Sequence, residues 1–317
     1  MLALRYLRGK FPDITAEQFR FCRRHGFYPD RAREYDFERY RPEDYFPDSS
    51  AGSPGRTIEP GDWECCRDKL FFALLMGAIG ASTPPVLAEN VNGRIIIYTD
   101  EAADFETLLR ARGELVVKPR GNVGGGVGVR IVRPDDADPA PRPGELVTPR
   151  IQQHAYAATI YPGSANTIRA MTAWDYDAGD VFVGAAAHRF GSSLAATVDN
   201  WASGGLAAGI DLATGRLGPA IRLPSVDPQR VRHATHPDTK AQIEGVEIPR
   251  FGEMCEGLLA VARRFPRRYV GWDIVITPDA WTLVEANHIA ELSIFQCHRP
   301  VLLDPRLRRF YEREGVL

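Results

Sequence analysis

Three oxygen-bearing side chains near the C-terminus have the types and spacing of a magnesium site. Asp273 lies within an apolar run, and Glu285 and Asn287 end the next apolar run. Side chains two apart on a strand project to one face, and Asp273 can sit on the neighbouring strand of the same hairpin. Magnesium prefers carboxylate and amide oxygens and shares them with nucleotide phosphates. The alternative is an exposed hairpin whose carboxylates face solvent.

A lysine and a glycine-rich turn upstream have the composition of a phosphate-binding site. Lys118 ends a strand predicted over 114–118, and a turn that contains Gly124, Gly125 and Gly126 follows it. Glycines let backbone amides approach phosphate oxygens, and an ammonium group offsets the phosphate charge. The turn matches neither the Walker pattern nor a dinucleotide fingerprint. A flexible hairpin turn explains the glycines equally well.

The elements that must position these residues fall into two groups. The first is predicted to contain a helix over 62–80, strands at 86–88 and 94–98, a helix from Asp100 to Arg110, and strands at 114–118 and 129–132. A surface loop over 135–143 separates it from the second group. That group is predicted to contain strands at 146–147, 167–174, 181–188, 270–276 and 281–285 and a helix over 251–265. Strands in hairpins around one long helix predict an antiparallel α+β core.

The first sixty residues predict a helical extension that ends in a Gly/Pro/Ser-rich linker over 49–60. Thr15 and Gln18 have the spacing of a capping box, which marks a helix start. Aromatic residues alternate with arginines here, a pattern that fits either nucleic-acid stacking or core packing, and we expect core packing. These aromatic residues are Phe19, Phe21, Phe27, Tyr28, Tyr35, Phe37, Tyr40, Tyr45 and Phe46.

Composition limits the classes of function. The 317 residues, 44% of them hydrophobic, are enough for one large domain or two or three packed subdomains. A net charge of -2 gives no overall field that would attract nucleic acid or an anionic membrane. Five cysteines without a CxxC pair indicate a reducing cytosol rather than a disulfide framework or a zinc site. The longest apolar stretch, 70–81, falls short of the roughly 20 residues of a membrane span, and the N-terminus does not resemble a secretory signal.

Taken as an ordered set, these segments resemble the ATP-grasp superfamily, and within it the sugar-transfer-associated ATP-grasp group. The resemblance runs from about Asp68 to Leu292. The segments that carry it are 68–70, 117–119 with the glycine turn, 166–169, 198–205 with 209–211, 271–273, and Glu285 with Asn287. The resemblance implies an α+β fold in which two α+β subdomains clamp ATP. The small subdomain would span 61–147 and the large one 148–317, after a helical N-terminal extension over 1–60.

The resemblance also implies roles for individual residues. Lys69 and Lys118 resemble the two lysines that contact ATP phosphates, and Arg169 resembles a core-strand arginine that faces phosphate. The residues that resemble the loop over the β and γ phosphates are Gly124, Gly125 and Gly126. Those that resemble the ligands of one or two magnesium ions are Asp273, Glu285 and Asn287.

Two features depart from the family pattern. The segment that should hold adenine through its backbone is formed by Thr148, Pro149, Arg150 and Ile151, and Pro149 has no N–H to donate. Many members carry a glutamate near this position. Peptide-forming members often have an arginine two residues before the first metal-ligand aspartate, where this sequence has Gly271. Arg189 or Arg169 could take over the task of steadying the oxyanion.

The function implied by the resemblance is an ATP- and Mg²⁺-dependent ligase. It would activate a small-molecule carboxylate as an acyl phosphate for attack by an amine or a thiol, in the cytoplasm and without nucleic acid. Asn200 begins a polar, glycine-rich loop suited to covering bound ligand. The sequence leaves the two substrates and the oligomeric state open, with a homodimer as one option.

Phosphotransfer to a hydroxyl, for example of a sugar, is the alternative activity. It needs the same nucleotide site and a base, for which the sequence offers Asp199, Asp211 or His188. His188 is more simply explained as a hydrogen-bonded core histidine. His288, beside Asn287, fits a place near the metals and a purely structural role equally well. A nucleotide-binding protein without turnover is a third interpretation.

Overall fold

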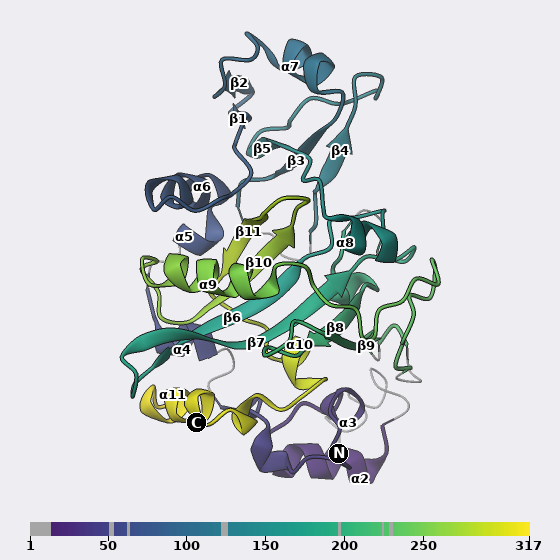
Figure 1. Cartoon of the computed structure of the whole chain (residues 1–317), viewed down its shortest axis with the longest axis vertical. Coiled ribbons are helices and arrows are strands. Elements are labelled where there is room, and N and C mark those ends of the chain that lie inside the picture. The colour runs from purple at the N-terminus through teal and green to yellow at the C-terminus, as the bar shows by residue number, and fades with distance from the viewer. Residues whose placement is uncertain are drawn as a thin grey trace.

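The computed structural model describes residues 14–50, 54–61, 64–121, 126–195, 198–223, 225–227 and 231–317. Its helices and strands form an α+β fold with two antiparallel sheets, as the sequence predicts. The small sheet lies at one end of the molecule and the large sheet in the middle (Figure 1). The N-terminal helices and the last helix lie together at the opposite end.

The small sheet has the strand order β2-β1-β5-β3-β4. Its strands are β1 (Ala88–Val91), β2 (Arg94–Ile97), β3 (Leu115–Pro119), β4 (Arg130–Val132) and β5 (Glu145–Pro149). Helix α7 (Phe105–Arg112) packs on the sheet through Leu108 and Leu109. β3 and β5 are neighbours, with Val116 opposite Thr148, so Lys118 and the segment after β5 come from adjacent strands.

The large sheet has the strand order β11-β10-β6-β7-β8-β9. Its strands are β6 (Ile168–Asp175), β7 (Asp180–Phe190), β8 (Leu206–Ile210), β9 (Leu217–Ile221), β10 (Val270–Ile276) and β11 (Trp281–Asn287). Helix α9 (Phe251–Ala262) covers one face. The other face packs against α10 (Ser293–Gln296), η3 (Val301–Leu303) and α11 (Pro305–Arg313). Helix α8 (Ala155–Ile160) and the short η2 (Trp201–Ser203) lie in the connections.

The helix predicted over 62–80 is wrong as a single element. The structure has α5 (Glu64–Arg67) and α6 (Lys69–Ala78), and Asp68 between them has extended backbone angles. Its carboxylate accepts hydrogen bonds from the N–H groups of Leu70 and Phe71, so it caps the second helix. Helix α7 likewise begins after Asp104 rather than Asp100, because Asp104 accepts the capping hydrogen bond from the Thr107 N–H.

Helices α2 (Ala16–Arg24), α3 (Arg31–Glu34) and η1 (Pro42–Asp44) pack as a small N-terminal unit. Helix α4 (Pro54–Ile58), within the predicted linker, packs instead through Ile58 on the cluster that joins the large sheet to the C-terminal helices. The capping box of Thr15 and Gln18 is present as predicted. Tyr35 and Tyr45 are buried and stack with their ring centroids 4.6 Å apart, whereas Tyr28 stays exposed. Core packing therefore explains most of the aromatic residues.

All five cysteines lie within the described ranges, and each is a thiol. No helix among the described residues has both the length and the apolar character that crossing a membrane requires.

Candidate functional site

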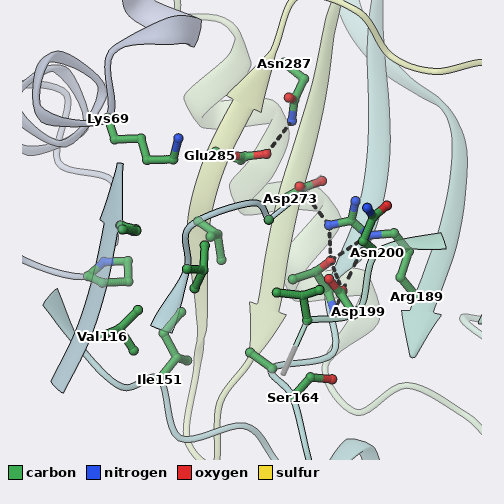
Figure 2. Close-up of a pocket in the computed structure, with 18 of the residues that line it drawn as sticks. Lys69, Val116, Ile151, Ser164, Arg189, Asp199, Asn200, Asp273, Glu285 and Asn287 are labelled. Carbon is green, nitrogen blue, oxygen red and sulfur yellow. Dashed lines mark hydrogen bonds and ion pairs between the residues drawn. The ribbon is translucent and has the colours of Figure 1, made fainter. Parts of the chain in front are cut away.

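A cavity of about 560 Å³ lies between the two sheets and brings most of the predicted site residues together (Figure 2). Its size falls within the range of small-molecule sites, roughly 300–1,000 Å³. The predicted residues that line it are Lys69, Lys118, Gly126, Thr148, Pro149, Arg150, Ile151, Arg169, Arg189, Asn200, Asp273, Glu285 and Asn287. Gly124 and Gly125 lie outside the described residues.

The β10–β11 hairpin places the three predicted metal ligands on one wall. Asp273 is directly opposite Glu285 in the ladder, and the Asn287 side-chain amide donates to Glu285 Oε1 at 3.3 Å. The register shifts between Asp273 and Ile274, so that Val284 is an extra residue on β11. This bulge brings the Val284 side chain to the cavity next to Glu285, a use of bulges that is common beside active sites.

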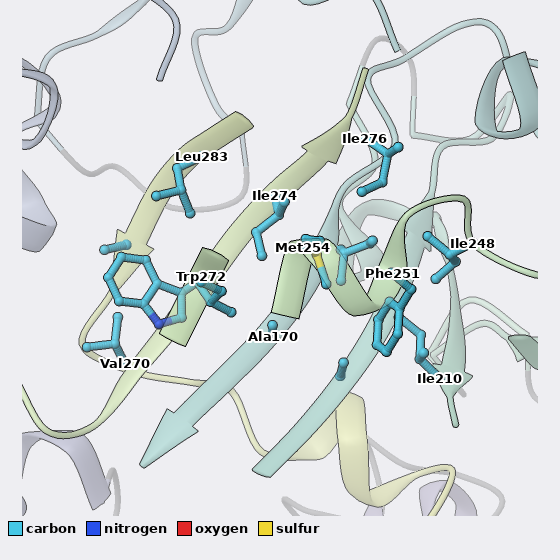
Figure 3. Close-up of a cluster of buried hydrophobic side chains, with 14 of the residues drawn as sticks. Ala170, Ile210, Ile248, Phe251, Met254, Val270, Trp272, Ile274, Ile276 and Leu283 are labelled. Atoms are coloured by element: carbon cyan, nitrogen blue, oxygen red, sulfur yellow. The ribbon is translucent and has the colours of Figure 1, made fainter. Parts of the chain in front are cut away.

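The opposite face of the hairpin is part of the main core (Figure 3). Trp272 and Ile274 are fully buried and pack with Met254 of α9. The Trp272 indole N–H donates to Thr172 Oγ1 at 2.8 Å, which satisfies its buried donor. Because side chains alternate along a strand, this packing fixes the face from which Asp273 projects.

Two arginines from neighbouring strands hold Asp273. Arg169 on β6 donates from Nε to Asp273 Oδ1 at 2.5 Å and from Nη2 to Oδ2 at 3.2 Å. Arg189 on β7 donates to Asp273 Oδ2 at 2.8 Å. Asp273 and Arg169 are only 3% and 5% exposed. Asp199 and Glu291 lie beside the same two arginines, so charges of both signs line this part of the cavity.

Arg189 also connects Asp273 to the loop after β7. Arg189 donates from Nε to Thr167 Oγ1 at 2.9 Å and lies 3.4 Å from Asp199 Oδ2. Asp199 Oδ2 also accepts from the Thr167 N–H at 2.8 Å and from its hydroxyl at 2.5 Å. Asp199 therefore holds Thr167, the residue just before β6, and helps to position Arg189.

Gly271 is required by a close approach of the chain. A Cβ at this position would lie 2.9 Å from Ala290 Cα and 3.5 Å from Arg169 Cδ. The loop 288–291 and the Arg169 side chain thus fill the space that an arginine at 271 would need. The structure places both candidate replacements, Arg169 and Arg189, at this point beside Asp273.

The electrostatics of the carboxylate pair suit a divalent cation. Burial, and then the charge of Asp273, raise the pKa of Glu285. Burial alone would raise the pKa of Asp273, but Arg169 and Arg189 outweigh it and hold that pKa below its ordinary value. Two carboxylates that face each other without a cation repel, and a divalent ion between them would remove that repulsion.

The donor set also fits magnesium. Among the described residues no three His, Cys, Asp or Glu side chains gather in a metal-binding arrangement, so the protein offers two carboxylates and the amide of Asn287 at most. Magnesium is usually held by one or two carboxylates, with phosphate and water supplying the remaining ligands.

The two lysines lie across the cavity from this wall. Burial, and then the charge of Lys69, lower the pKa of Lys118 to about 8. Lys69 opens α6, and its ammonium donates to the carbonyl of Gly121 at the start of the glycine turn at 3.2 Å. Asp68, which caps α6, pairs with Arg120 at 2.7 Å and so ties this helix to the turn. Figure 2 shows Lys69 pointing toward Glu285.

The segment after β5 presents backbone rather than side chains. The Arg150 guanidinium turns away to pair with Glu114 at 3.0 Å. Within the described part of the chain, the N–H and C=O of Ile151 make no hydrogen bond. The apolar side chains around this segment form a slot of the kind that a flat aromatic base fills. They are Val116, Val129, Ile131, Val284 and Ile289.

Two of the candidate bases lie outside the cavity. His188 is fully buried on the core face of β7, where Nε2 lies 2.7 Å from the Tyr156 hydroxyl and Nδ1 lies 3.1 Å from the Arg189 carbonyl. Burial lowers its pKa to about 3. Asp211 caps the turn after β8 through hydrogen bonds from Ala213 and Thr214. His188 is thus the core histidine that its sequence context favours.

Asn200 lines the cavity, but its side chain also organises the loop. Its Oδ1 accepts from the Ala202 N–H at 3.1 Å, and its Nδ2 donates to Ser203 Oγ at 2.8 Å. His288 also lines the cavity, beside Asn287.

Some cavity residues could not be identified from the sequence. Glu291 lines the cavity and lies 3.6 Å from Arg169, yet it follows β11 in an irregular loop with no motif. Its φ of +55° is unusual for a residue other than glycine and would be the structural sign of a constrained position. Thr167 and Asp199 lie in segments that carry the family resemblance, but only the contacts reveal their shared link to Arg189.

The sequence profile of the family described as sugar-transfer associated ATP-grasp matches residues 140–312, more than half of the chain. The chain belongs to this ATP-grasp family. The match covers the large sheet and the wall with Asp273, Glu285 and Asn287. No curated protein sequence matches the chain at a significant level.

Solved structures of ATP-grasp enzymes are distantly similar. An N5-carboxyaminoimidazole ribonucleotide synthetase from Thermotoga maritima is 12% identical, with a TM-score of 0.38 over 71% of this chain and 42% of that one. The ATP-grasp ligase PsnB with its minimal precursor is 16% identical, with a TM-score of 0.36 over 71% and 53%. An L-amino acid ligase from Bacillus licheniformis is 12% identical, with a TM-score of 0.37 over 73% and 42%. The chain spans about half the length of these structures, and similarities at this level carry no argument about function.

Proposed function

We propose that this ATP-grasp protein is an ATP- and Mg²⁺-dependent ligase that joins a carboxylate to an amine or a thiol. ATP would lie between the two sheets, in a cleft between subdomains spanning 61–147 and 148–317. The Pro149 carbonyl and the Ile151 N–H would hold adenine, and Lys69, Lys118 and the glycine turn would hold the phosphates. Asp273, Glu285 and Asn287 would hold Mg²⁺, which when bound neutralises phosphate charge and orients the γ-phosphoryl group.

The proposed reaction has two steps. A carboxylate oxygen attacks the γ-phosphorus, the bond between that phosphorus and the β–γ bridging oxygen breaks, and ADP leaves. The amine or thiol then attacks the carbonyl carbon of the acyl phosphate, the C–O bond to phosphate breaks, and the nucleophile's proton passes to solvent or phosphate. No protein nucleophile is needed, so the work of the residues is positioning and charge stabilisation.

The observation that carries the proposal is the convergence of two arginines on Asp273 at the wall of the cavity. Arg189 and Arg169 converge on Asp273 and can donate to a carboxylate substrate or to the oxyanion that forms at its carbonyl. Of the candidate bases for a hydroxyl acceptor, His188 is sealed in the core and Asp211 caps a turn. Asp199 reaches the cavity, but its Oδ2 already accepts two hydrogen bonds from Thr167 and lies 3.4 Å from Arg189. A ligase fits this arrangement better than a hydroxyl kinase.

The cytosolic location remains part of the proposal. It is supported by the five thiols, which are compatible with a reducing compartment.

Trapping of the acyl phosphate tests the proposal. The protein is incubated with ATP, Mg²⁺, a panel of carboxylic acids and hydroxylamine, and hydroxamate and ADP are both measured. The proposal predicts hydroxamate in proportion to ADP for at least one acid. ADP release with sugars or other hydroxyl compounds, and no hydroxamate with any acid, would favour the kinase instead.

A further inference from the structure

Helix α4 (Pro54–Ile58) lies against the loop that closes one side of the proposed nucleotide cleft. This loop, 288–291, follows β11, and three of its four residues line the cavity: His288, Ile289 and Glu291. Its inner side crosses β10 at Gly271. Its outer side contacts a segment that lies outside the region matched by the family, which begins at residue 140.

The closest contact is between Gly55 and the loop. A Cβ at Gly55 in α4 would lie 1.7 Å from the carbonyl oxygen of His288. An ordinary contact needs about twice that separation, so a side chain here would force α4 and the His288 peptide apart. Gly55 has no left-handed backbone angle, so the cost of an alanine there would come from His288 rather than from strain at Gly55 itself.

A buried amide holds α10, the helix that follows the loop 288–291. Gln296 in α10 is 1% exposed, and all its side-chain hydrogen bonds reach the N-terminal segment. Its Oε1 accepts from the Phe46 N–H at 2.7 Å, and its Nε2 donates to the Phe46 carbonyl at 3.1 Å and to the Tyr35 hydroxyl at 2.9 Å. Helix α10 lies between the large sheet and the N-terminal helices (Figure 1). A fully satisfied buried amide of this kind specifies one arrangement of the two segments.

The N-terminal segment also holds the start of β10. Glu59 Oε1 accepts from the Arg268 N–H at 2.9 Å, two residues before the strand that carries Asp273. Ile58 belongs to the same apolar cluster as Ala290 and Phe295. Contacts from this segment therefore reach the chain just before β10 and just after β11.

We infer that the N-terminal extension positions the loop 288–291, and that Gly55 and Gln296 are positioning residues of the nucleotide site. Neither lines the cavity; they act through the places they give to Asn287 and Glu291. The expected effect on Mg²⁺-nucleotide affinity rests on the proposed function, whereas the effect on the loop does not.

Hydrogen exchange and calorimetry on the full-length protein test the inference with Gly55→Ala, Gln296→Met and the control Gly77→Ala. Gly77 lies in α6, where a Cβ would meet no atom within 4 Å. Exchange is measured over 285–292 without ligand, and binding of Mg²⁺-AMPPNP is measured by titration. Both site variants should remain folded, exchange faster over this loop and bind roughly tenfold or more weakly, the scale found when partners of metal ligands are removed. The control should match wild type in both measurements.

Wild-type exchange over the loop together with wild-type affinity, in either folded variant, would overturn the inference. If Gly55→Ala or Gln296→Met does not fold, Tyr35→Phe decides, because it removes only the acceptor of one Gln296 bond and keeps both bonds to Phe46. If the wild type binds no nucleotide, the proposed function fails while the exchange data still decide the positioning role.

Discussion

Replacing Arg189 with methionine should both destabilise the protein and slow the proposed reaction. The Arg189 side chain is only 11% exposed; it donates to Thr167 and Asp273 and lies 3.4 Å from Asp199. Removing one partner from a buried ion pair costs about 3–5 kcal/mol because the other charge loses its partner. Arg169 still donates to Asp273, and Thr167 still donates to Asp199. We therefore expect a loss at the lower end, about 3 kcal/mol.

Urea unfolding at neutral pH, followed by tryptophan fluorescence, measures this loss. The control is Arg263→Met, because Arg263 pairs with Asp180 through two bonds of 2.8 Å while both side chains are about half exposed. An exposed pair contributes little to stability. The control gives the cost of losing a guanidinium–carboxylate pair at an exposed site, so the larger loss expected in Arg189→Met reports on the network of Asp273 and Thr167.

The kinetic effect should separate binding from chemistry. If Arg189 donates to the oxyanion, the rate at saturating substrate should fall by about 10²–10³, the effect of losing one such donor. The KM for ATP should change much less, because in the proposed site Lys69 and Lys118, and not Arg189, hold the phosphates. A loss of stability no larger than that of Arg263→Met would refute the account of the buried network. A variant with an unchanged rate would refute the catalytic role.

Three further predictions concern the lysine wall, the core histidine and the cap of α6. Because the pKa of Lys118 is about 8, its positive charge is mostly present near pH 7 and mostly lost near pH 9. The affinity for Mg²⁺-nucleotide, measured by calorimetry, should therefore fall between pH 7 and pH 9. It should fall less in Lys118→Met. In the folded protein the pKa of His188 is about 3, whereas in the unfolded chain His188 takes up a proton near pH 6.5. The free energy of unfolding should therefore fall by about 1.4 kcal/mol for each pH unit below 6.5 because of this residue. Urea unfolding of His188→Gln should lack that contribution. Asp68→Ala removes the cap of α6 and the pair with Arg120; we expect a loss of about 1–2 kcal/mol and weaker nucleotide binding, since Lys69 follows directly. Unchanged binding in Asp68→Ala would show that Lys69 does not need this cap.

Apolar periodicity and residue spacing predict the walls of the site well. The runs around Asp273 and Glu285 are apolar, β-branched and broken by a turn, so both strands and their pairing can be anticipated. The strand that ends at Lys118 is predicted for the same reason. Strong local patterns and the tertiary structure agree at these places.

Helix boundaries and weakly patterned strands are predicted less well. An apolar spacing continues through Asp68, and only its capping hydrogen bonds in the folded chain reveal that α5 and α6 are separate. β8 and β9 were not predicted from the sequence because alanine, glycine and proline dilute their β-propensity. Their neighbours in the sheet supply the stability that their composition does not.

The chemistry of the arginines depends on three-dimensional register. The sequence identifies Gly271 as a gap and Arg169 and Arg189 as the candidates to fill it. That both converge on Asp273 follows from the pairing of β6 with β10 and β7, which places Asp273 opposite Arg169. The reason for the glycine itself is the contact with Ala290, which only the tertiary fold provides.

Calorimetric titration of wild type and Glu285→Gln with AMPPNP, with and without Mg²⁺, tests the central claim most directly. It needs no knowledge of the acid or the nucleophile. Glu285 is the better choice for substitution than Asp273, because Asp273 also holds two buried arginines. We predict that the wild type binds one nucleotide more tightly with Mg²⁺ and that Glu285→Gln keeps the binding but loses the gain from Mg²⁺. No binding by the wild type, or a gain from Mg²⁺ that survives in Glu285→Gln, would contradict the assignment of this cleft.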